Sequence, residues 1–477
     1  MLQDTIKQIS DEFLAEAQKS PRLLEDMASM EKYMAESYGG RVFFELLQNA
    51  DDAISSEVLL TSIGDSIIFA NNGRPFSSED VVAISRSGAS TKKRGSTIGY
   101  RGVGFKSTTC LSSEIAIFSD GVWFSFSKTI CAQRLDITQD KIPVVRIPFL
   151  TCIANEFVRK FVGKLHGKGY TTVFVFSGAE AVRIASELNE LSIDQFLFLN
   201  HVCNCSVELE SLNLHYQIIR KHNSTGSLIQ VNNGIIEKEW LLISNEGTSL
   251  ALQYSNGKIV PCESSEAVFH CFLPTHDKAP FLCKINGDFS TDPSRKHLVM
   301  DEATVSILHH AAKLVFTLIY SSVQKSGGSN IPGVFELLTT YESFSKFNIE
   351  FRQKLKELLI NENWIPLSNG ELVSARSYPL LPSWLEPSEQ IFLRTKSMVI
   401  SNSSLSPGIY KNNIAFDSFI GSYSTELVTA QSLIAMMEDK EFVSILLDDL
   451  AAKIYINIIK ACKAEEITSG RNLNIDN

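Results

Sequence analysis

The chain has 477 residues, of which 44% are hydrophobic and 21% charged, a length for about three domains and a composition that excludes general disorder. The chain has 44 Lys and Arg residues against 54 Asp and Glu, a net charge of −10. This charge argues against a surface that coats nucleic acid but does not exclude a local basic groove. No run of about 18 apolar residues occurs, no basic and hydrophobic leader begins the chain, and the nine cysteines lack regular spacing, so we expect a cytoplasmic protein without a membrane segment.

Residues 1–35 predict an N-terminal helical segment. Leu2, Ile6, Ile9 and Phe13 recur at helical spacing, and Pro21 interrupts the run. The pattern alone is that of a helix that covers its own domain.

Residues 43–53 predict a helix with a polar face. Glu45, Asn49 and Asp52 follow one another at i, i+4 and i+7, beside an apolar stripe. An amide can ligate hydrated Mg²⁺, and a carboxylate one turn away can polarise water. The pattern therefore indicates a helix that lines a ligand cavity, or else an ordinary amphipathic surface helix.

A strand, a turn, a loop and a glycine run follow in order. Residues 66–70 read as a buried strand, residues 71–75 as a turn and residues 85–97 as a polar loop. The glycine run then presents three residues whose backbone N–H groups can converge on an anion, Gly99, Gly102 and Gly104. The ordered set indicates a nucleotide site.

These motifs resemble the GHKL ATPase superfamily, which includes gyrase B, MutL proteins, heat-shock chaperones and sacsin. Residues 45–53 resemble its first box, residues 69–73 its adenine-reading box, residues 98–107 its phosphate-binding lid hinge, and residues 170–176 the strand with the closing threonine. The residue order in the glycine run most resembles that of the sacsin-like and No Vein-like branch. Residues 285–289 and 364–370 support that branch.

The resemblance implies an α+β fold. We expect a two-layer α/β sandwich of the Bergerat type over residues 1–178, with the N-terminal helical segment. That segment either covers its own domain or, as in the chaperone branch, packs on the lid or on a partner subunit. A mixed transducer-like domain would cover residues 179–325, with helix predicted from 179 to 199 and from about 301 to 324. A mainly helical region would cover residues 331–477, with helices over 335–361 and 432–462 and a β-hairpin over 364–373.

The resemblance also implies roles for single residues. Glu45 would deprotonate the attacking water, and Asn49 would hold Mg²⁺. Arg295 in the second domain would supply the catalytic cation, with Lys296 as the alternate. The remaining cofactor-binding residues would surround ATP: Asp52, Asn71, Gly73, Gly99, Gly102, Gly104, Phe105, Lys106 and Thr172, with Thr171 as the alternate to Thr172 and with Lys106 alternatively a solvated surface lysine.

Two departures bear on base preference. Asn71 stands where the family has an aspartate that accepts a hydrogen bond from adenine, and its amide adds a donor and removes a charge. Pro75 replaces a second glycine after Gly73. Binding of a nucleotide is therefore expected more firmly than selection of adenine.

The function expected from the resemblance is a slow Mg²⁺-dependent ATPase that works as a molecular switch or clamp. ATP would close a lid over residues 85–105, with domain rearrangement or homodimerisation, and the clamp would act like a chaperone on protein partners. One alternative is the ATPase subunit of a bacterial antiphage or DNA-processing system. The other is a nucleotide-binding scaffold that hydrolyses little.

Overall fold

The computed structural model describes most of the chain and divides it into two compact units. The described residues are 2–37, 41–86, 104–179, 181–189, 191–210, 212–222, 226–292, 294–324, 333–340, 344–366, 372–378, 380–382, 384–386, 388–389, 414–425, 428–437 and 448–469. Unit 1 comprises Met1–Ile243, Phe269–Asp277 and Asn286–Thr304. Unit 2 comprises Ser244–Val268, Lys278–Ile285 and Val305–Asn477.

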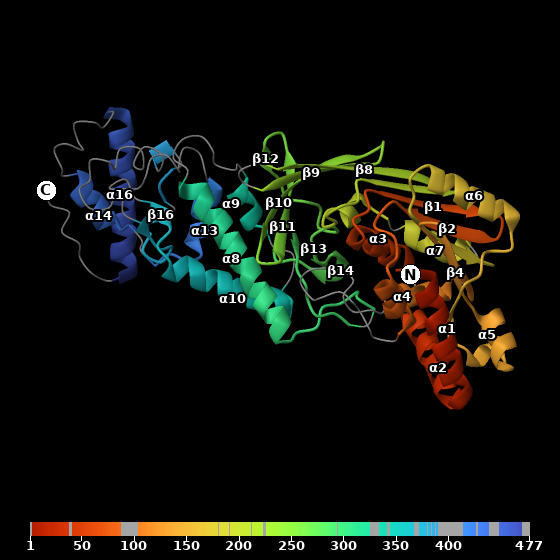
Figure 1. The fold of residues 1–477 in the computed structure, drawn as a ribbon. Coiled ribbons are helices and arrows are strands. Elements are labelled where there is room, and N and C mark those ends of the chain that lie inside the picture. The colour runs from red at the N-terminus through yellow and green to blue at the C-terminus, as the bar shows by residue number, and fades with distance from the viewer. Residues whose placement is uncertain are drawn as a thin grey trace. The chain divides into compact units, whose positions relative to one another are not determined.

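Unit 1 is built on a mixed sheet (Figure 1). Its strands lie in the order β10 (Glu237–Asn245), β9 (Ser227–Asn232), β8 (Leu212–His222), β7 (Asn204–Leu209), β1 (Glu57–Ile63), β2 (Ser66–Asn71), β6 (Thr172–Ser177), β3 (Glu114–Ser119), β4 (Val122–Ser127) and β5 (Pro148–Phe149). The β1–β7 pair is parallel, and the β1–β2 and β2–β6 pairs are antiparallel. The sheet is therefore mixed, as predicted.

Helices of unit 1 cover the sheet. They are α1 (Leu2–Lys19), α2 (Pro21–Ser37), α3 (Val42–Asp52), α4 (Ser78–Ser85), α5 (Lys128–Leu135), α6 (Glu156–Gly167) and α7 (Ala181–Asn189), with 3₁₀ turns η1 (Gly104–Cys110), η2 (Gln139–Lys141) and η3 (Ile193–Phe196). Pro21 is the first residue of α2, where its missing N–H costs nothing. The predicted interruption at Pro21 is confirmed.

The sheet buries both faces because alternate residues of its central strands pack on different helices. Val158 and Val162 of α6 form a core with Ile68, Ala70 and Val173 on one face. Phe69 lies on the other face, where its ring contacts Phe43 of α3 at 6.2 Å between centroids. All six residues of β2 are buried, which agrees with the continuous apolar run that predicted this strand.

Two short strands late in the chain, β13 (Val268–Cys271) and β14 (Leu273–Lys278), lie almost wholly in unit 1. Of the next strand, β15 (Lys284–Asn286), only Asn286 belongs to unit 1. The segment after β15 carries Arg295 and belongs to unit 1 through Thr304. A residue from the latter half of the sequence thus lies in the same compact unit as α3.

Unit 2 is mainly helical. It contains β11 (Thr248–Ser255), β12 (Lys258–Ile259), α8 (Glu302–Gln324), α9 (Val334–Leu338), α10 (Lys346–Asn361), β16 (Ile365–Pro366), β17 (Leu372–Val373), α13 (Ile414–Gly421), α14 (Ala430–Met437) and α16 (Asp448–Ser469). By length and composition Glu302–Val323 could cross a membrane. Leu308, Ala312 and Val315 of α8 are nevertheless buried, so α8 fits the central helix of this unit's core.

The predicted fold class is confirmed at the level of a large mixed sheet with helices and a helical C-terminal region. The hairpin predicted over 364–373 is confirmed by the pairing of β16 with β17. The prediction of a single helix over 335–361 is wrong, because α9 ends at Leu338 and a new helix, α10, begins at Lys346. Ser345 is the N-cap of α10, where its side chain accepts a hydrogen bond from Asn348 N at 3.2 Å. The helix expected over 179–199 likewise stops at Asn189 and resumes as η3. The three-part division along the chain stays a prediction.

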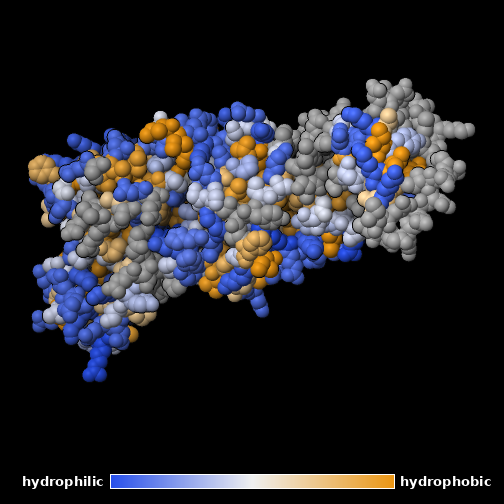
Figure 2. Space-filling model, turned by 180° about the vertical axis from the view of Figure 1, so that it is seen from behind, coloured by the Kyte–Doolittle hydropathy of each residue, from blue (hydrophilic) through white to orange (hydrophobic). Residues whose placement is uncertain are grey.

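Exposed apolar side chains are spread over several elements. Figure 2 shows hydrophobic areas set among hydrophilic ones on the face turned away in Figure 1. The most exposed large apolar residues are Ile235 after β9, Phe157 in α6 and Phe344 before α10. They come from different parts of the chain, and the Arg352 guanidinium lies over the Phe344 ring at 5.1 Å from its centroid.

Candidate functional site

Helix α3 is almost wholly buried, which is unusual for a helix rich in polar residues. Glu45, Gln48 and Asp51 are each at most 2% exposed, and Arg41, the residue before the helix, is 6% exposed. Asn49, Asp52 and Ala53 are only partly buried. The described part of α3 therefore opens to solvent along one strip, formed by residues at i, i+3 and i+4, and this strip contains the predicted Mg²⁺ ligand Asn49.

The N-terminus of α3 is capped by a carboxylate from α7. Phe44 N donates a hydrogen bond to Glu187 Oε1 at 3.0 Å, while Arg41 provides no side-chain cap. Burial raises the pKa of Glu187 to about 7, although the backbone N–H groups of Phe44, Phe43 and Val42 act in the opposite direction. A carboxylate suits the positive end of the helix, and here it orients the start of α3.

Glu45 and Arg295 form a buried ion pair. Glu45 Oε1 and Arg295 Nη1 lie 2.8 Å apart, and the two side chains are 3% and 10% exposed. Arg295 Nη1 also donates to Gln48 Oε1 at 3.4 Å, across 247 residues of sequence. The fold thus brings together the two side chains that the sequence analysis assigned to the base and the cation.

The turn around Arg295 is held in an uncommon conformation. Arg295 has φ of 56°, in the left-handed region that non-glycine residues seldom occupy. Arg41 Nη1 donates to the carbonyl oxygen of Arg295 at 2.7 Å, and Asp292 accepts from Lys296 N at 3.1 Å. These contacts fix the backbone so that the guanidinium of Arg295 turns toward α3. Lys296, the alternate cation, is partly buried in the same turn.

Asp51 takes a structural role that the sequence analysis did not foresee. Its carboxylate accepts three backbone hydrogen bonds: Asn200 N at 2.9 Å, His201 N at 2.7 Å and Val202 N at 2.9 Å. Asp51 therefore joins the C-terminal end of α3 to the segment that leads into β7. Asp52, the predicted cofactor residue, lies instead on the open strip of α3.

Three polar side chains form a buried row across adjacent strands. Asn71 of β2 lies opposite Thr172 of β6, and Thr172 lies opposite Ser119 of β3. Thr172 Oγ1 and Ser119 Oγ are 3.3 Å apart, and Asn71 is only 4% exposed. Asn71 and Thr172 share a sheet face with Phe69 and Phe174, because side chains alternate along each strand. The predicted base-reading residues thus lie together on the face that α3 covers.

The turn after β2 is built by the two asparagines. Asn71 Oδ1 accepts from Gly73 N at 3.1 Å, and one lone pair of that oxygen remains. Asn72 Oδ1 accepts from Ser55 Oγ, Ser56 N and Glu57 N, each at 2.9 Å. Thr171 Oγ1 donates to the carbonyl oxygen of Gly73, whereas Thr172 stays in the buried row. Asn72 therefore ties the turn to residues 55–57, a contact that the local Asn-Gly turn signal did not indicate.

Gly73 has a close neighbour inside the protein. A Cβ at this position would lie 2.6 Å from the carbonyl oxygen of Ala53, and Arg74 N donates to that oxygen at 2.7 Å. The missing side chain thus lets the turn approach the C-terminal end of α3. Asn49, Asp52 and the turn of Asn71 consequently belong to one continuous region.

The end of the glycine run packs against α2 and α3. Gly104 begins η1, and the Phe105 ring lies 5.5 Å from that of Phe174 between centroids. Lys106 is only 6% exposed, so the alternative of a solvated lysine is wrong. Burial lowers the pKa of Lys106, while the charge of Glu31 in α2 opposes that shift. Gly99, Gly102, most of the predicted lid and the basic residues 92–94 lie outside the described residues.

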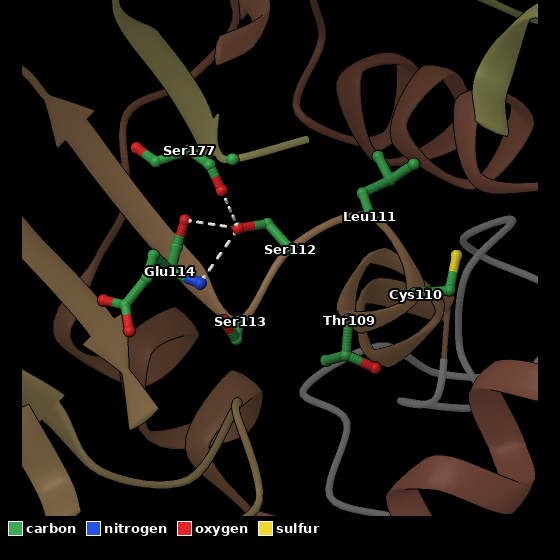
Figure 3. Close-up of a pocket in the computed structure, with 8 residues that line it drawn as sticks. Thr109, Cys110, Leu111, Ser112, Ser113, Glu114 and Ser177 are labelled. Atoms are coloured by element: carbon green, nitrogen blue, oxygen red, sulfur yellow. Dashed lines mark hydrogen bonds between the residues drawn. The ribbon is translucent and has the colours of Figure 1, made fainter. Parts of the chain in front are cut away.

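A separate cavity lies at the end of η1. It has a volume of about 480 Å³ and is lined by Thr109, Cys110, Leu111, Ser112, Ser113, Glu114, Ser177 and Gly178. Figure 3 shows Ser112 Oγ bonded to the carbonyl oxygen of Ser177 and to the backbone of Glu114, and the first of these contacts is 2.5 Å long. None of the predicted site residues lines it. We assign this cavity no role, because its central hydroxyl is already satisfied by the protein.

No protein-family model matches the chain. Among curated proteins, the chain is similar to the protein NO VEIN of Arabidopsis thaliana, with 27% identity over 310 residues. The similarity covers 57% of this chain and 11% of the relative, so the chain spans about a tenth of that protein's length. The likeness agrees with the No Vein-like branch expected from the glycine run. It does not by itself assign an activity.

Proposed function

We propose that this chain binds Mg²⁺-ATP in the manner of the GHKL superfamily and hydrolyses it slowly. The observation that carries the proposal is the buried contact of Arg295 Nη1 with Glu45 Oε1 at 2.8 Å. An acid and a cation far apart in sequence meet at α3, which contacts η1 and packs on the sheet face that carries the polar row of Asn71, Thr172 and Ser119. This set of groups suits a base, a charge-stabilising cation and a phosphate-binding segment.

The residues present fit the two implied ligands. Asn49 on the open strip of α3 offers a hard amide oxygen, and Mg²⁺ keeps several waters when one or two protein oxygens and substrate phosphates complete its shell. When bound, Mg²⁺ neutralises charge on the triphosphate. Asn71 Oδ1 keeps a lone pair for a donor such as the adenine amino group, since Gly73 N takes the other.

The protein's own groups would divide the chemistry as follows. Glu45 accepts the proton of the attacking water, and Arg295 faces the charge that develops on the transferred phosphoryl group. Arg41 and Asp292 hold the Arg295 turn, and Glu187 holds the start of α3. A base and a cation that already touch can hydrolyse only after the nucleotide separates them, which is consistent with a slow enzyme.

Closure upon ATP would convert this chemistry into a switch that acts on protein partners, with a homodimer as one form of the closed state. Such coupling requires that the closed form prefer ATP to ADP, since equal affinity shifts no equilibrium. The alternative of a nucleotide-binding scaffold that hydrolyses little would be favoured only if Glu45 is dispensable for turnover.

The test is a pair of measurements on the full chain. Calorimetry with Mg²⁺ and a non-hydrolysable ATP analogue should show binding to the wild type and to Glu45→Gln alike. Phosphate release should fall by about 10²- to 10⁴-fold in Glu45→Gln. Glu208→Gln, at an exposed carboxylate of β7, is the control and should hydrolyse like the wild type. Absence of binding heat in the wild type would overturn the proposal, and equal slow turnover in all three proteins would favour the scaffold.

A further inference from the structure

Three buried polar atoms at the N-terminal half of α3 have no hydrogen-bond partner among the described residues. They are Arg41 Nε, Glu45 Oε1 and Gln48 Nε2. Glu45 Oε1 has the charge of Arg295 beside it but no well-aligned hydrogen bond. The three residues are 6%, 2% and 1% exposed, so bulk water does not satisfy them. Buried polar groups are nearly always paired, and three exceptions in one cluster call for a common cause.

The orientation of the Gln48 amide follows from its neighbour. Arg295 can only donate, so the oxygen Oε1 must be the atom that faces Nη1 at 3.4 Å. The nitrogen Nε2 is therefore left with two N–H donors on the other side of the amide. Residues 41, 45 and 48 follow at i, i+4 and i+7, which places their side chains on one face of α3.

An ordered water would satisfy all three atoms at once. Water in a buried site needs two to four polar partners, and this cluster offers two donors and one acceptor. The water would accept from Gln48 Nε2 and Arg41 Nε and donate to Glu45 Oε1. In this position the water would donate a hydrogen bond to the proposed base, Glu45, and the two N–H groups would fix where its oxygen lies.

We propose that Gln48 holds the attacking water for hydrolysis. This inference rests on the proposed ATPase function. In the step, a bond forms between the water oxygen and the γ-phosphorus, and the bond from that phosphorus to the bridging oxygen breaks with its electron pair leaving on ADP. The water proton passes to Glu45. Gln48 transfers no proton and acts by orienting the water. The competing role for Gln48 is purely structural, as an acceptor that keeps Arg295 in place.

Gln48→Glu separates the two roles, because it keeps an oxygen for Arg295 and removes both N–H donors. We expect its affinity for the Mg²⁺-bound non-hydrolysable ATP analogue to stay within about 3-fold of the wild type, while kcat falls by about 10²-fold. The second carboxylate beside Glu45 should also move the acidic limb of the kcat–pH profile to higher pH. Gln48→Met, which removes both roles at similar volume, should lose at least as much kcat.

The matched control is Gln195→Glu, at a buried glutamine of η3 whose Oε1 accepts from Ser192 N at 2.7 Å. It keeps that acceptor and should leave kcat unchanged. The inference is overturned if Gln48→Glu retains the wild-type kcat and pH profile, or if it loses binding of the analogue together with turnover. Should Gln48→Glu fail to fold, Gln48→Met still overturns the inference if it retains the wild-type kcat. A wild type that binds no Mg²⁺-ATP instead overturns the function on which the inference rests.

Discussion

The two ends of α3 bury polar side chains in opposite ways. At the C-terminal end, Asp51 accepts three backbone N–H groups at 2.7–2.9 Å, and the neighbouring Asn72 accepts three further hydrogen bonds. At the N-terminal end, Arg41, Glu45 and Gln48 each keep an atom without a partner among the described residues. Asp51, Glu45 and Gln48 are equally excluded from water, at 1%, 2% and 1% exposed. A saturated cluster indicates architecture, whereas an incompletely paired one indicates a place prepared for a ligand.

The saturated end should dominate stability. Asp51→Ala removes the acceptor of three hydrogen bonds to a charged group, each worth about 1.5 kcal/mol, so we expect a loss of about 4.5 kcal/mol in the free energy of unfolding. Urea denaturation measures the total loss. Hydrogen–deuterium exchange should localise it, with the amides of residues 200–202 exchanging faster.

Asp51→Asn sharpens this test because it keeps one acceptor oxygen and should lose roughly half as much stability. Asp11→Ala, at an exposed position of α1, is the control and should change stability by less than about 0.5 kcal/mol. If Asp51→Ala is as stable as the control, pairing at this end of α3 does not support the fold and the contrast between the two ends fails.

The sequence predicted the elements of the site better than its contacts. Helix 43–53, the strand before Asn71 and the turn at Gly73 follow from local periodicity and turn chemistry, and the structure contains all three. Which of two neighbouring aspartates would be buried could not be predicted from these local signals. Asp51 and Asp52 are chemically alike and differ by about 100° around the helix, so only the position of residues 200–202 decides which one is buried.

Contacts between residues distant in sequence could not be predicted either, because they also depend on how distant segments fold together. The nearness of Arg295 to Glu45 was expected only through the resemblance, and its left-handed backbone and its contact with Arg41 had no sequence signature. Gln48 and Glu187 read as ordinary helix residues. Their contacts arise because a loop and a helix distant in sequence fold against α3 and replace water as partners.

Glu187 provides a second test, at the incompletely paired end. Its pKa is raised to about 7, mainly by burial, against an ordinary value of 4.5. The folded state therefore binds the proton more tightly than the unfolded state, and the stability contributed by this group is present below pH about 4.5 and is lost as pH rises to about 7. Glu187→Gln keeps an acceptor for Phe44 N without a titrating charge. We expect it to exceed the wild type by about 3 kcal/mol at pH 8 and to match it near pH 4.5.

The measurement is the free energy of unfolding from urea titrations at pH 4.5, 6, 7 and 8. Glu208→Gln, an exposed carboxylate, should follow the wild-type pH dependence throughout. A wild-type curve that is identical to that of Glu187→Gln at every pH would show that this cap does not carry a buried titrating charge.

Gly73 lies against the C-terminal end of α3, and its substitution is expected to have the smallest effect on the free energy of unfolding. A Cβ there would meet the carbonyl oxygen of Ala53 at 2.6 Å and its Cβ at 3.0 Å, and Ala53 is the C-cap residue of α3. Gly73→Ala must therefore push the turn from the helix, and we expect a loss of about 2 kcal/mol in the free energy of unfolding without any nucleotide present. Gly163→Ala, in α6 with no atom near its added Cβ, should instead be neutral or gain up to about 1 kcal/mol.

The pair of measurements decides what the missing side chain of Gly73 serves. If Gly73→Ala loses stability and retains affinity for the non-hydrolysable ATP analogue, the close approach serves the contact between the turn and α3. If stability is unchanged while affinity for the analogue falls, the space belongs to the ligand, and the turn must be grouped with the incompletely paired end of α3. A loss of both would mean that nucleotide binding requires Asn71 to be held beside α3, because a displaced turn also displaces the amide that is proposed to read the base.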